Sequence, residues 1–387
     1  MGGRVLFSCL PGYGHLNPLL PLARAFREAG DEVCIAAGPG ITEEVARQGF
    51  AVVAVGPSLG EIERRFLNEV PGLPTLDPTA HLAEVVAGMF ARTAARARLE
   101  GLAQACRDFA PGLVVHDAFD FAAPVVATLC AVPAVAHGVT LQRFAGELAE
   151  RALDALDALW ISAGAPGQAA ALLENPFLDV CPPALARGSA DVFSDRRPIR
   201  TVTRGAAAPS PELSRRLDQL PHARTVHVTL GTVVNTTPGL LETLVAGAAR
   251  LDVNVVATVG PGRDPAVLGP QPPSVLVASY IPHDALLARC CAVVSHAGAG
   301  TLLTALARGL PSLLAPVATD QAPNAALAAA AGVASVLRLD GLDADTVATA
   351  LRQLIDDPRP RSAAARVAQE IAAMPSPEEV RAGLPCL

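Results

Sequence analysis

The chain has 387 residues, of which 17% are charged, and its formal net charge is −7 at pH 7. A chain of this length exceeds one ordinary hydrophobic core, so two domains are expected. A weakly charged acidic chain is poorly suited to a polyanion, which argues against a nucleic-acid partner. All 30 residues counted as lysine or arginine are arginines. Enzymes that need a lysine amine on a P-loop, a pyridoxal cofactor or a Schiff base are therefore excluded.

The cysteines and the hydropathy pattern bear on the compartment. The eight cysteines form no C-x-x-C pair, and most stand in apolar segments, so we expect reduced core residues. The chain begins with a strand pattern that leaves no room for a signal peptide. No apolar run reaches about 18 residues without turn and charge signals, so no membrane insertion is expected. These features favour a cytoplasmic protein.

Short runs of Val, Leu, Ile and Ala alternate with longer segments of helical period, the pattern of a doubly wound α/β architecture. The first half predicts strands at Val5–Cys9, Val33–Ala37, Ala51–Val55, Leu113–His116 and Ala134–His137. The second half predicts strands at Thr225–Leu230, Asn254–Val259, Val275–Ala278, Ala292–Ser295, Ser312–Ala315 and Ala334–Leu337. Between them, Arg196–Pro221 is rich in Pro, Ala and Ser and is the predicted linker. We therefore expect a first domain over residues 1–205 and a second over residues 206–370.

In the first half, His15 follows a predicted strand and a glycine turn and precedes the predicted helix Pro18–Glu28. It should lie at the carboxyl end of that strand, where a neutral imidazole can remove a proton from an attacking hydroxyl. The alternative is a histidine that packs against or caps the helix. Asp117, directly after the strand Leu113–His116, is the favoured partner for this base. Asp120 is a rival for the same role, and a helix N-cap is the alternative role at this position.

In the second half, Ser295–Thr301 reads SHAGAGT and separates a strand run from a helical one. Glycines let a backbone approach a bound group, and the N–H groups and dipole of the following helix favour phosphate. Upstream lies Tyr280–His283, and Thr319–Asn324 follows at the end of the next predicted strand. Successive strand ends of a parallel sheet open onto one crevice. An aromatic ring, a phosphate cradle and an acid–amide pair are therefore expected to line a single ligand.

The sequence predicts no metal site. It contains no H-E-x-x-H motif and no clustered spacing of metal ligands. Asp343 and Asp345 imitate an Asp-x-Asp metal pair, but they precede the apolar-periodic segment Val347–Ile355. We therefore predict that they cap a helix.

Together these stretches resemble the family 1 glycosyltransferases of the GT-B fold, in particular the bacterial enzymes that glycosylate antibiotics and other natural products. The resemblance covers nearly the whole chain. It rests on PGYGHLNP at residues 11–18 and on a stretch from Tyr280 to about Gln321 that looks like the donor-sugar box. It implies an α/β fold with two Rossmann-like domains, each a doubly wound parallel sheet, that face a central cleft. It also implies that residues 371–387 return to the N-terminal domain.

The resemblance implies roles for the matching positions. His15 becomes the general base, with Asp117 in support. The other roles are diphosphate binding by Gly231, Thr232, His296, Gly298, Gly300 and Thr301, nucleobase binding by Tyr280, Ile281 and His283, and sugar binding by Asp320 and Gln321. Ordinary turns and a polar helix cap are the alternatives in these loops. Tyr280 stands where relatives usually carry tryptophan, so stacking persists with less area. Thr304 stands where plant relatives carry a glutamate that binds both ribose hydroxyls, which favours a dTDP-sugar over a UDP-sugar.

The expected function is inverting, metal-independent transfer of a sugar, in particular a deoxysugar, from a dTDP- or UDP-sugar to an apolar small-molecule natural product. The nucleotide sugar is a co-substrate, and neither a cofactor nor a metal is expected, because protein donors carry the charge of the leaving group. Phe66, Phe90 and Phe144 are candidates for acceptor contact, with core packing as their alternative. A nucleotide-sugar epimerase and a catalytically silent nucleotide-sugar-binding protein are the competing hypotheses. A homodimer is left open.

Overall fold

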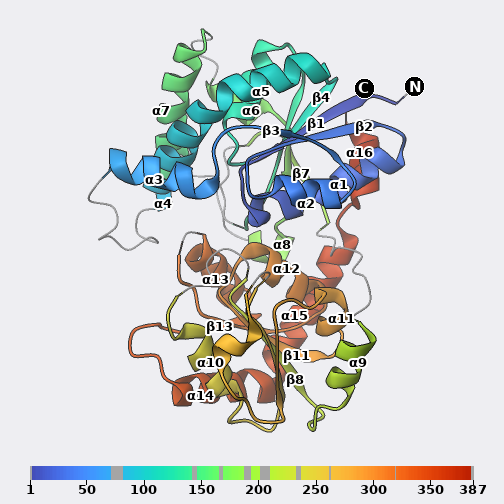
Figure 1. The fold of residues 1–387 in the computed structure, drawn as a ribbon, viewed down its shortest axis with the longest axis vertical. Coiled ribbons are helices and arrows are strands. Elements are labelled where there is room, and N and C mark those ends of the chain that lie inside the picture. The colour runs from blue at the N-terminus through green and yellow to red at the C-terminus, as the bar shows by residue number, and fades with distance from the viewer. Residues whose placement is uncertain are drawn as a thin grey trace. The chain divides into compact units, whose positions relative to one another are not determined.

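The computed structural model describes residues 2–70, 82–141, 146–164, 169–186, 193–200, 210–231, 237–260, 263–318 and 320–384. The chain divides into two compact units. Unit 1 comprises Met1–Cys181, Gly188–Arg200 and Pro375–Leu387, and unit 2 comprises Pro182–Arg187 and Thr201–Met374. Figure 1 shows a sheet with helices in each unit. Each unit also has its own cluster of buried apolar residues. Each is therefore a domain with its own core.

Unit 1 contains a seven-stranded parallel sheet in the order β3-β2-β1-β4-β5-β6-β7. Its strands are β1 (Arg4–Cys9), β2 (Glu32–Ala37), β3 (Ala51–Ala54), β4 (Leu113–Asp117), β5 (Ala134–His137), β6 (Phe177–Asp179) and β7 (Arg196–Pro198). Its helices are α1 (Tyr13–Glu28), α2 (Thr42–Arg47), α3 (Leu59–Glu69), α4 (Leu82–Glu84), α5 (Ala95–Phe109), α6 (Ala122–Leu129), α7 (Gly146–Ser162) and α16 (Pro377–Gly383), with a π-helix at Val85–Ala94 and a 3-10 helix at Ala169–Glu174. In Figure 1, α1 and α2 lie on one side of these strands and α5 and α6 on the other.

The last helix, α16, belongs to unit 1 although it follows all of unit 2 in the chain. It packs against α1. Arg381 Nη2 lies 2.8 Å from the buried Asp31 Oδ2, and its guanidinium lies over the ring of Phe26. The backbone N–H of Arg200 donates to the carbonyl of Pro375 at 2.7 Å. Polar and aromatic contacts thus fasten this segment to the first domain.

Unit 2 contains a six-stranded parallel sheet in the order β10-β9-β8-β11-β12-β13. Its strands are β8 (Thr225–Thr229), β9 (Asn254–Thr258), β10 (Val275–Ala278), β11 (Cys290–Ser295), β12 (Ser312–Leu314) and β13 (Ala334–Val336). Its helices are α8 (Pro183–Ala186), α9 (Pro211–Asp218), α10 (Leu240–Ala248), α11 (His283–Leu287), α12 (Ala299–Ala307), α13 (Gln321–Ala330), α14 (Ala344–Asp356) and α15 (Pro358–Ala373), with a 3-10 helix at Pro265–Leu268. In the described part of the chain, none of the helices has the length and apolar character needed to cross a membrane.

The predicted doubly wound α/β fold is confirmed, and so are all of the predicted strands, to within one or two residues. Every residue of β4, β8 and β9 is buried, because helices cover parallel sheets on both faces. The predicted helix cap at Asp343 is also confirmed, since its carboxylate accepts a hydrogen bond from the Thr346 N–H at 2.8 Å. β6 and β7 were not predicted, because they consist of FLD and RRP, in which charged side chains or proline interrupt the apolar pattern.

Two sequence predictions need correction. The linker predicted at Arg196–Pro221 is wrong at both ends, because it contains β7 and α9. The start of α9 has ordinary signals, an N-cap serine followed by proline, which the composition of the segment obscured. The first helix starts at Tyr13 rather than at Pro18, so two prolines lie inside it. His15 therefore lies in the first turn of α1 and not ahead of it.

The order of strands locates the places where a ligand can enter each sheet. In unit 1 the chain runs from β1 outward to β2 and β3 and then returns to place β4 on the other side of β1. In unit 2 it runs from β8 to β9 and β10 and returns to place β11 beside β8. Ligands of open α/β sheets bind beyond the carboxyl ends of the strands at such reversals. Ligands are therefore expected at the loops after β1 and β4 in unit 1 and at those after β8 and β11 in unit 2.

Candidate functional site

At the reversal in unit 1, the structure brings His15 and Asp117 together. Nδ1 of His15 lies 3.0 Å from Oδ2 of Asp117, and the Asp117 side chain is fully buried while that of His15 is 18% exposed. Asp117 is the last residue of β4, and His15 follows β1 across the turn at Gly12. A Cβ at residue 12 would meet the imidazole at 3.2 Å, so glycine leaves room for the ring. One face of the imidazole can therefore meet a ligand while its Nδ1 is held from inside.

The Asp117 carboxylate is fixed by the backbone as well as by His15. Oδ2 accepts a hydrogen bond from the Leu10 N–H at 3.0 Å, and Oδ1 accepts one from the Phe119 N–H at 2.7 Å. Burial alone raises the pKa of a carboxyl group, but the charge and hydrogen bond of His15 and these two N–H groups outweigh it, so the pKa of Asp117 is lowered. Asp117 is thus ionised at neutral pH and oriented toward the imidazole. Asp120, the rival partner, faces elsewhere and pairs with Arg98.

Two aromatic rings border the imidazole. The ring centroids of Phe90 and Phe119 lie 5.8 and 6.3 Å from that of His15, both edge to face. The Phe90 and Phe119 rings also touch each other, with centroids 5.6 Å apart. Phe90 belongs to the π-helical segment, and insertions of this type are frequent at functional sites. The exposed part of His15 therefore opens onto apolar surroundings.

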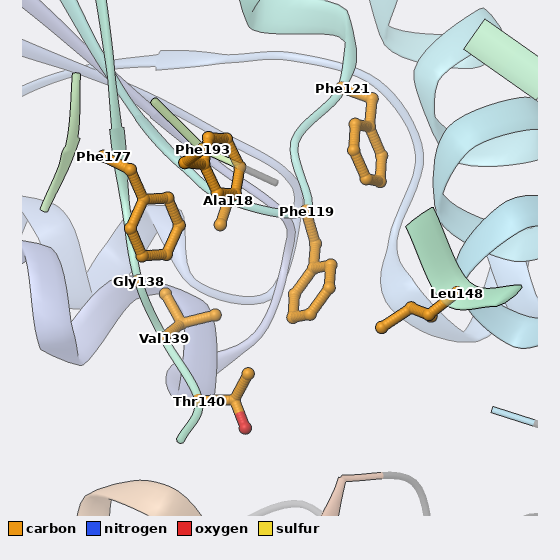
Figure 2. A pocket seen from close by; sticks show the side chains of 9 residues that line it. All are labelled: Ala118, Phe119, Phe121, Gly138, Val139, Thr140, Leu148, Phe177 and Phe193. Atoms are coloured by element: carbon orange, nitrogen blue, oxygen red, sulfur yellow. The ribbon is translucent and has the colours of Figure 1, made fainter. Parts of the chain in front are cut away.

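Phe119 also forms part of the wall of an apolar pocket in unit 1 (Figure 2). The pocket encloses about 410 Å³, counting the solvent at its mouth. Its lining is Ala118, Phe119, Phe121, Gly138, Val139, Thr140, Leu148, Phe177 and Phe193. The rings of Phe177 and Phe193 stack at 4.4 Å, and Figure 2 shows them facing the same space as Phe119. The apolar and aromatic lining is typical of a site for an apolar small molecule.

At the reversal in unit 2, one histidine occupies the space between two glycines. His296 follows β11, Gly231 follows β8, and Gly298 is the N-cap of α12. A Cβ at residue 231 would meet the His296 ring at 2.5 Å, and one at residue 298 would meet its Nε2 at 2.4 Å. Gly231 also has φ of +74°, where glycine is favoured. The glycines of this motif therefore make room for the imidazole as well as for a ligand.

The charge state of His296 follows from its burial. Burial lowers its pKa to about 4 against a smaller opposing effect of the Asp320 charge, so the ring is neutral at pH 7. Among the described residues, its buried Nδ1 has no hydrogen-bond partner. A buried polar atom of this kind calls for a ligand or water. His296 would therefore meet an anion as a neutral hydrogen-bonding group, beside the N-terminus of α12 and Thr301 in its first turn.

The loop after β12 is tied to the loop after β11 through Asn324, which is fully buried in α13. Its amide donates to the Ala297 carbonyl at 3.2 Å and to Asp320 Oδ2 at 2.9 Å. Ala297 has φ of +66°, a strained conformation for a residue with a side chain. Gln321 Oε1 accepts from the N–H groups of Val317 and Ala318 at 2.8 and 3.1 Å. The acid–amide pair and the loop after β11 are thus parts of one bonded unit.

The remaining candidates in unit 2 differ in their exposure. The ring of Tyr280 is 50% exposed, as a stacking platform requires, whereas Ile281 is buried in the core and can offer a ligand only its backbone. His283 starts α11 and lies edge to face against His227, with ring centroids 5.3 Å apart. The Thr304 hydroxyl donates to the Gly300 carbonyl of its own helix at 2.7 Å, so it is not directed at a ligand. Gly300 lies in the first turn of α12.

Other predictions fall outside this arrangement. Thr232 and Phe144 lie outside the described residues. Phe66 is only 2% exposed and packs in the core, where it borders Gly88. Sequence reasoning missed Phe119 and the pocket, because their meeting depends on β4, β5 and β6 lying side by side. Within the described ranges, no three His, Cys, Asp or Glu side chains gather closely enough to hold a metal ion.

Comparisons with known proteins agree with the two-domain architecture and with the family resemblance. A crystal structure of the glycosyltransferase SnogD from Streptomyces nogalater shares 31% identity with the chain, with a TM-score of 0.77 and coverage of 99% of both chains. The spinosyn rhamnosyltransferase SpnG complexed with thymidine diphosphate shares 26% identity, with a TM-score of 0.81 and coverage of 98% of this chain and 99% of the other. The protein is a glycosyltransferase of the GT-B fold.

Sequence comparison identifies the family of glycosyltransferases to which the chain belongs. Residues 24–231 match the model of the N-terminal domain described as Erythromycin biosynthesis protein CIII-like, and residues 242–387 match that of its C-terminal domain. The L-demethylnoviosyl transferase of Streptomyces niveus is 32% identical over 98% of this chain and 97% of its own length. The chain belongs to the EryCIII-like family of bacterial natural-product glycosyltransferases.

Proposed function

We propose that the protein transfers a sugar, in particular a deoxysugar, from a dTDP- or UDP-sugar to an apolar natural-product aglycone, with inversion at the anomeric carbon and without a metal ion. The 3.0 Å contact between His15 Nδ1 and Asp117 carries this proposal. An imidazole held at Nδ1 by a buried carboxylate presents Nε2 as a base, and the carboxylate stabilises the imidazolium that forms. The same arrangement would have no use in a protein that only binds nucleotides.

The proposed reaction is a single displacement. The acceptor oxygen forms a bond to the anomeric carbon while the bond from that carbon to the diphosphate oxygen breaks. The acceptor proton moves to Nε2 of His15, and the nucleoside diphosphate leaves with the electron pair. Attack on the face opposite the leaving group inverts the anomeric configuration.

The donor would be held by unit 2. Nδ1 of the neutral His296 ring, which has no partner among the described residues, is suited to stabilise negative charge on the departing diphosphate, together with the N–H groups at the start of α12 and the hydroxyl of Thr301. Tyr280 offers a face for the nucleobase. Asp320 would accept from sugar hydroxyls, and Gln321 would donate through its amide nitrogen, since its oxygen holds the loop. These protein donors make a metal ion unnecessary for the leaving group.

Two observations favour dTDP over UDP. Thr304 is a short, buried side chain whose hydroxyl donates to its own helix, so this position offers no carboxylate to pair with the two ribose hydroxyls. SpnG and the glycosyltransferase VinC, which is 27% identical to this chain, were both solved with thymidine diphosphate. The apolar pocket beside Phe119 supports an apolar acceptor, and SpnG was also solved with the spinosyn aglycone. Phe90 and Phe119 would then guide the acceptor hydroxyl to His15.

The first test compares wild type with His15→Ala and Asp117→Asn. dTDP- and UDP-linked hexoses and deoxyhexoses are supplied with a panel of aromatic and macrolactone aglycones, with EDTA present. We expect wild type to transfer the sugar with inverted configuration, measured by NMR, and His15→Ala to lose about 10²–10⁴-fold in kcat. Calorimetry should give an unchanged dTDP affinity for both variants.

Other outcomes would contradict the proposal in distinct ways. Full activity of His15→Ala would remove the base. A product that forms from the nucleotide sugar alone, without an aglycone, would favour an epimerase. Binding of dTDP with no turnover of any acceptor would favour a silent binding protein, and loss of activity in EDTA would overturn metal independence.

A further inference from the structure

An arginine is fully buried against Asp120, three residues after Asp117 in the same loop. Arg98 lies on α5 with a side chain that is 0% exposed. Its Nε and Nη2 donate to the two carboxylate oxygens of Asp120 at 3.2 and 2.9 Å, and Nη1 donates to the Val55 carbonyl at 2.9 Å. Nη2 also donates to Ser8 Oγ at 3.1 Å. The guanidinium therefore joins the carboxyl ends of β1, β3 and β4.

The remaining bonds of this cluster are also internal. Ser8 Oγ donates to Asp120 Oδ2 at 2.6 Å, and both side chains are buried. Gly56 leaves the space for Arg98, since a Cβ there would meet the Arg98 Cγ at 2.6 Å, and its φ is +74°. A buried guanidinium held by a bidentate carboxylate is a rigid anchor. One end of the loop 117–120 is therefore fixed by the cluster of Ser8, Arg98 and Asp120.

That loop carries the partner of His15. Asp117 at its start faces the imidazole, Phe119 packs on the imidazole, and Asp120 at its end faces Arg98. Two carboxylates three positions apart in one buried loop would repel each other without a cation between them. Arg98 neutralises the charge of Asp120, so the charge of Asp117 remains available to His15. When His15 takes up a proton, the imidazolium that forms neutralises the charge of Asp117.

We propose that Arg98 and Asp120 are positioning residues of the glycosyl transfer reaction, which hold Asp117 and Phe119 in the geometry that makes His15 a base. The inference rests on the proposed role of His15 and Asp117. Neither residue of the pair touches the imidazole, so both act through the loop. A buried ion pair that served stability alone would have no effect on turnover by folded enzyme.

The test uses the full-length protein with Asp120→Asn, Ser8→Ala and Arg98→Lys. Asp31→Asn is the matched control. Asp31 is also a buried carboxylate of unit 1, and its Oδ2 accepts hydrogen bonds from Nε and Nη2 of Arg381 at 3.1 and 2.8 Å. kcat is measured per folded enzyme, with the folded fraction obtained from circular dichroism and from the unfolding transition of unit 1 in calorimetry. The downfield proton resonance of the His15–Asp117 hydrogen bond is recorded by NMR and assigned by its loss in Asp117→Asn.

We expect Asp120→Asn to lower kcat about 10²-fold, the cost of misplacing a catalytic group by about 1 Å, with the KM of both substrates within about twofold of wild type. Ser8→Ala should lower kcat about tenfold, by the loss of one hydrogen bond to Asp120. Both should shift or broaden the downfield resonance. Arg98→Lys keeps the positive charge and loses the paired contact with Asp120, so it should lower kcat less than Asp120→Asn. Asp31→Asn should lose stability and keep kcat and the resonance.

The inference is overturned if Asp120→Asn folds and keeps both kcat and the resonance of wild type. If Asp120→Asn does not fold, Ser8→Ala decides on the same two readouts. An equal loss of kcat in Asp31→Asn would reduce the effect to general destabilisation, and that also overturns the proposal. Activity retained by His15→Ala would instead remove the proposed base, which is a separate failure.

Discussion

The position of the His296 imidazole leaves no space for a side chain at two neighbouring positions. Gly231 and Gly298 lie on either side of it, and each would bring a Cβ within 2.5 Å of the ring. Non-bonded atoms do not pack this closely in folded proteins, so the added Cβ or the histidine ring would have to move. Any side chain at these positions must therefore displace the histidine that we propose binds the diphosphate.

We predict that Gly298→Ala weakens dTDP binding at least about tenfold, because the extra methyl group displaces Nε2 of His296. Gly298 has φ of −61°, so the substitution adds no backbone strain and tests space alone. Gly60→Ala is the control, since a Cβ there meets nothing within 4 Å. Isothermal titration with dTDP measures both variants. Unchanged affinity of Gly298→Ala would show that the ring is not fixed as described.

At the scale of elements, Asn324 joins α13 to the loop after β11. Its two hydrogen bonds hold Ala297, which is strained, and Asp320, which is proposed to bind the sugar. Strained residues persist only where the surrounding structure holds them in place. The helix therefore keeps the loop after β11 and the loop after β12 in a fixed relation.

Replacement of Asn324 by alanine is expected to cost about 1–3 kcal/mol of stability and also to lower the affinity for dTDP. Asn254→Ala is the matched control, because that side chain is buried and bonds His222 N, His222 O and Thr225 Oγ1 away from the candidate site. The control should lose stability and keep dTDP affinity per folded protein. Thermal unfolding and calorimetry separate the two effects, and equal affinities in both variants would argue against the link.

Local patterns predicted the strands whose apolar runs stand between turn signals and failed where charged residues or proline interrupt the pattern. Short runs of Val, Leu, Ile and Ala identified β1–β5 and β8–β13, and the glycine turns marked the strand ends that carry His15 and His296. β7 and α9 were hidden in a segment whose composition is typical of a linker. The start of α1 was misplaced because proline is favoured in a first turn and yet lies inside this helix.

The candidate site also has parts that the sequence predicted and parts that it could not predict. Asp117 and Asp120 look equivalent in sequence, and only the course of the backbone after β4 decides which one faces His15. Arg98 gave no sequence signal, since an arginine on a helix usually points to solvent. The aromatic pocket is also invisible in sequence, because Phe119, Phe177 and Phe193 come from three separate segments.

For the molecule as a whole, buried histidines set the response to acid. Burial lowers the pKa of His137 in unit 1 and of His296 in unit 2 to about 4, against 6.5 for the free side chain. Between these values the unfolded chain binds protons that the folded chain does not, so stability falls as pH decreases from 6.5 toward 4. The lowered pKa of Asp117 adds a further loss in stronger acid.

We predict that each of these histidines costs about 2 kcal/mol of stability at pH 5 relative to pH 7. Differential scanning calorimetry from pH 8 to pH 5 should show little change in Tm above pH 7 from this source and a decrease below pH 6.5. The decrease should be smaller in His137→Gln for the transition of unit 1. A Tm that stays constant down to pH 5 would contradict the burial of neutral histidines.

The position of α16 has a consequence for building hybrid enzymes from members of the family. Because unit 1 includes Pro375–Leu387, a hybrid that exchanges only residues 1–200 receives its last helix from the other parent. That foreign helix would have to reproduce the pairing of Arg381 with Asp31 and its packing on Phe26. Exchange of residues 1–200 together with 375–387 keeps these contacts within one parent. Modular recombination of acceptor and donor specificities should therefore use two crossover points instead of one.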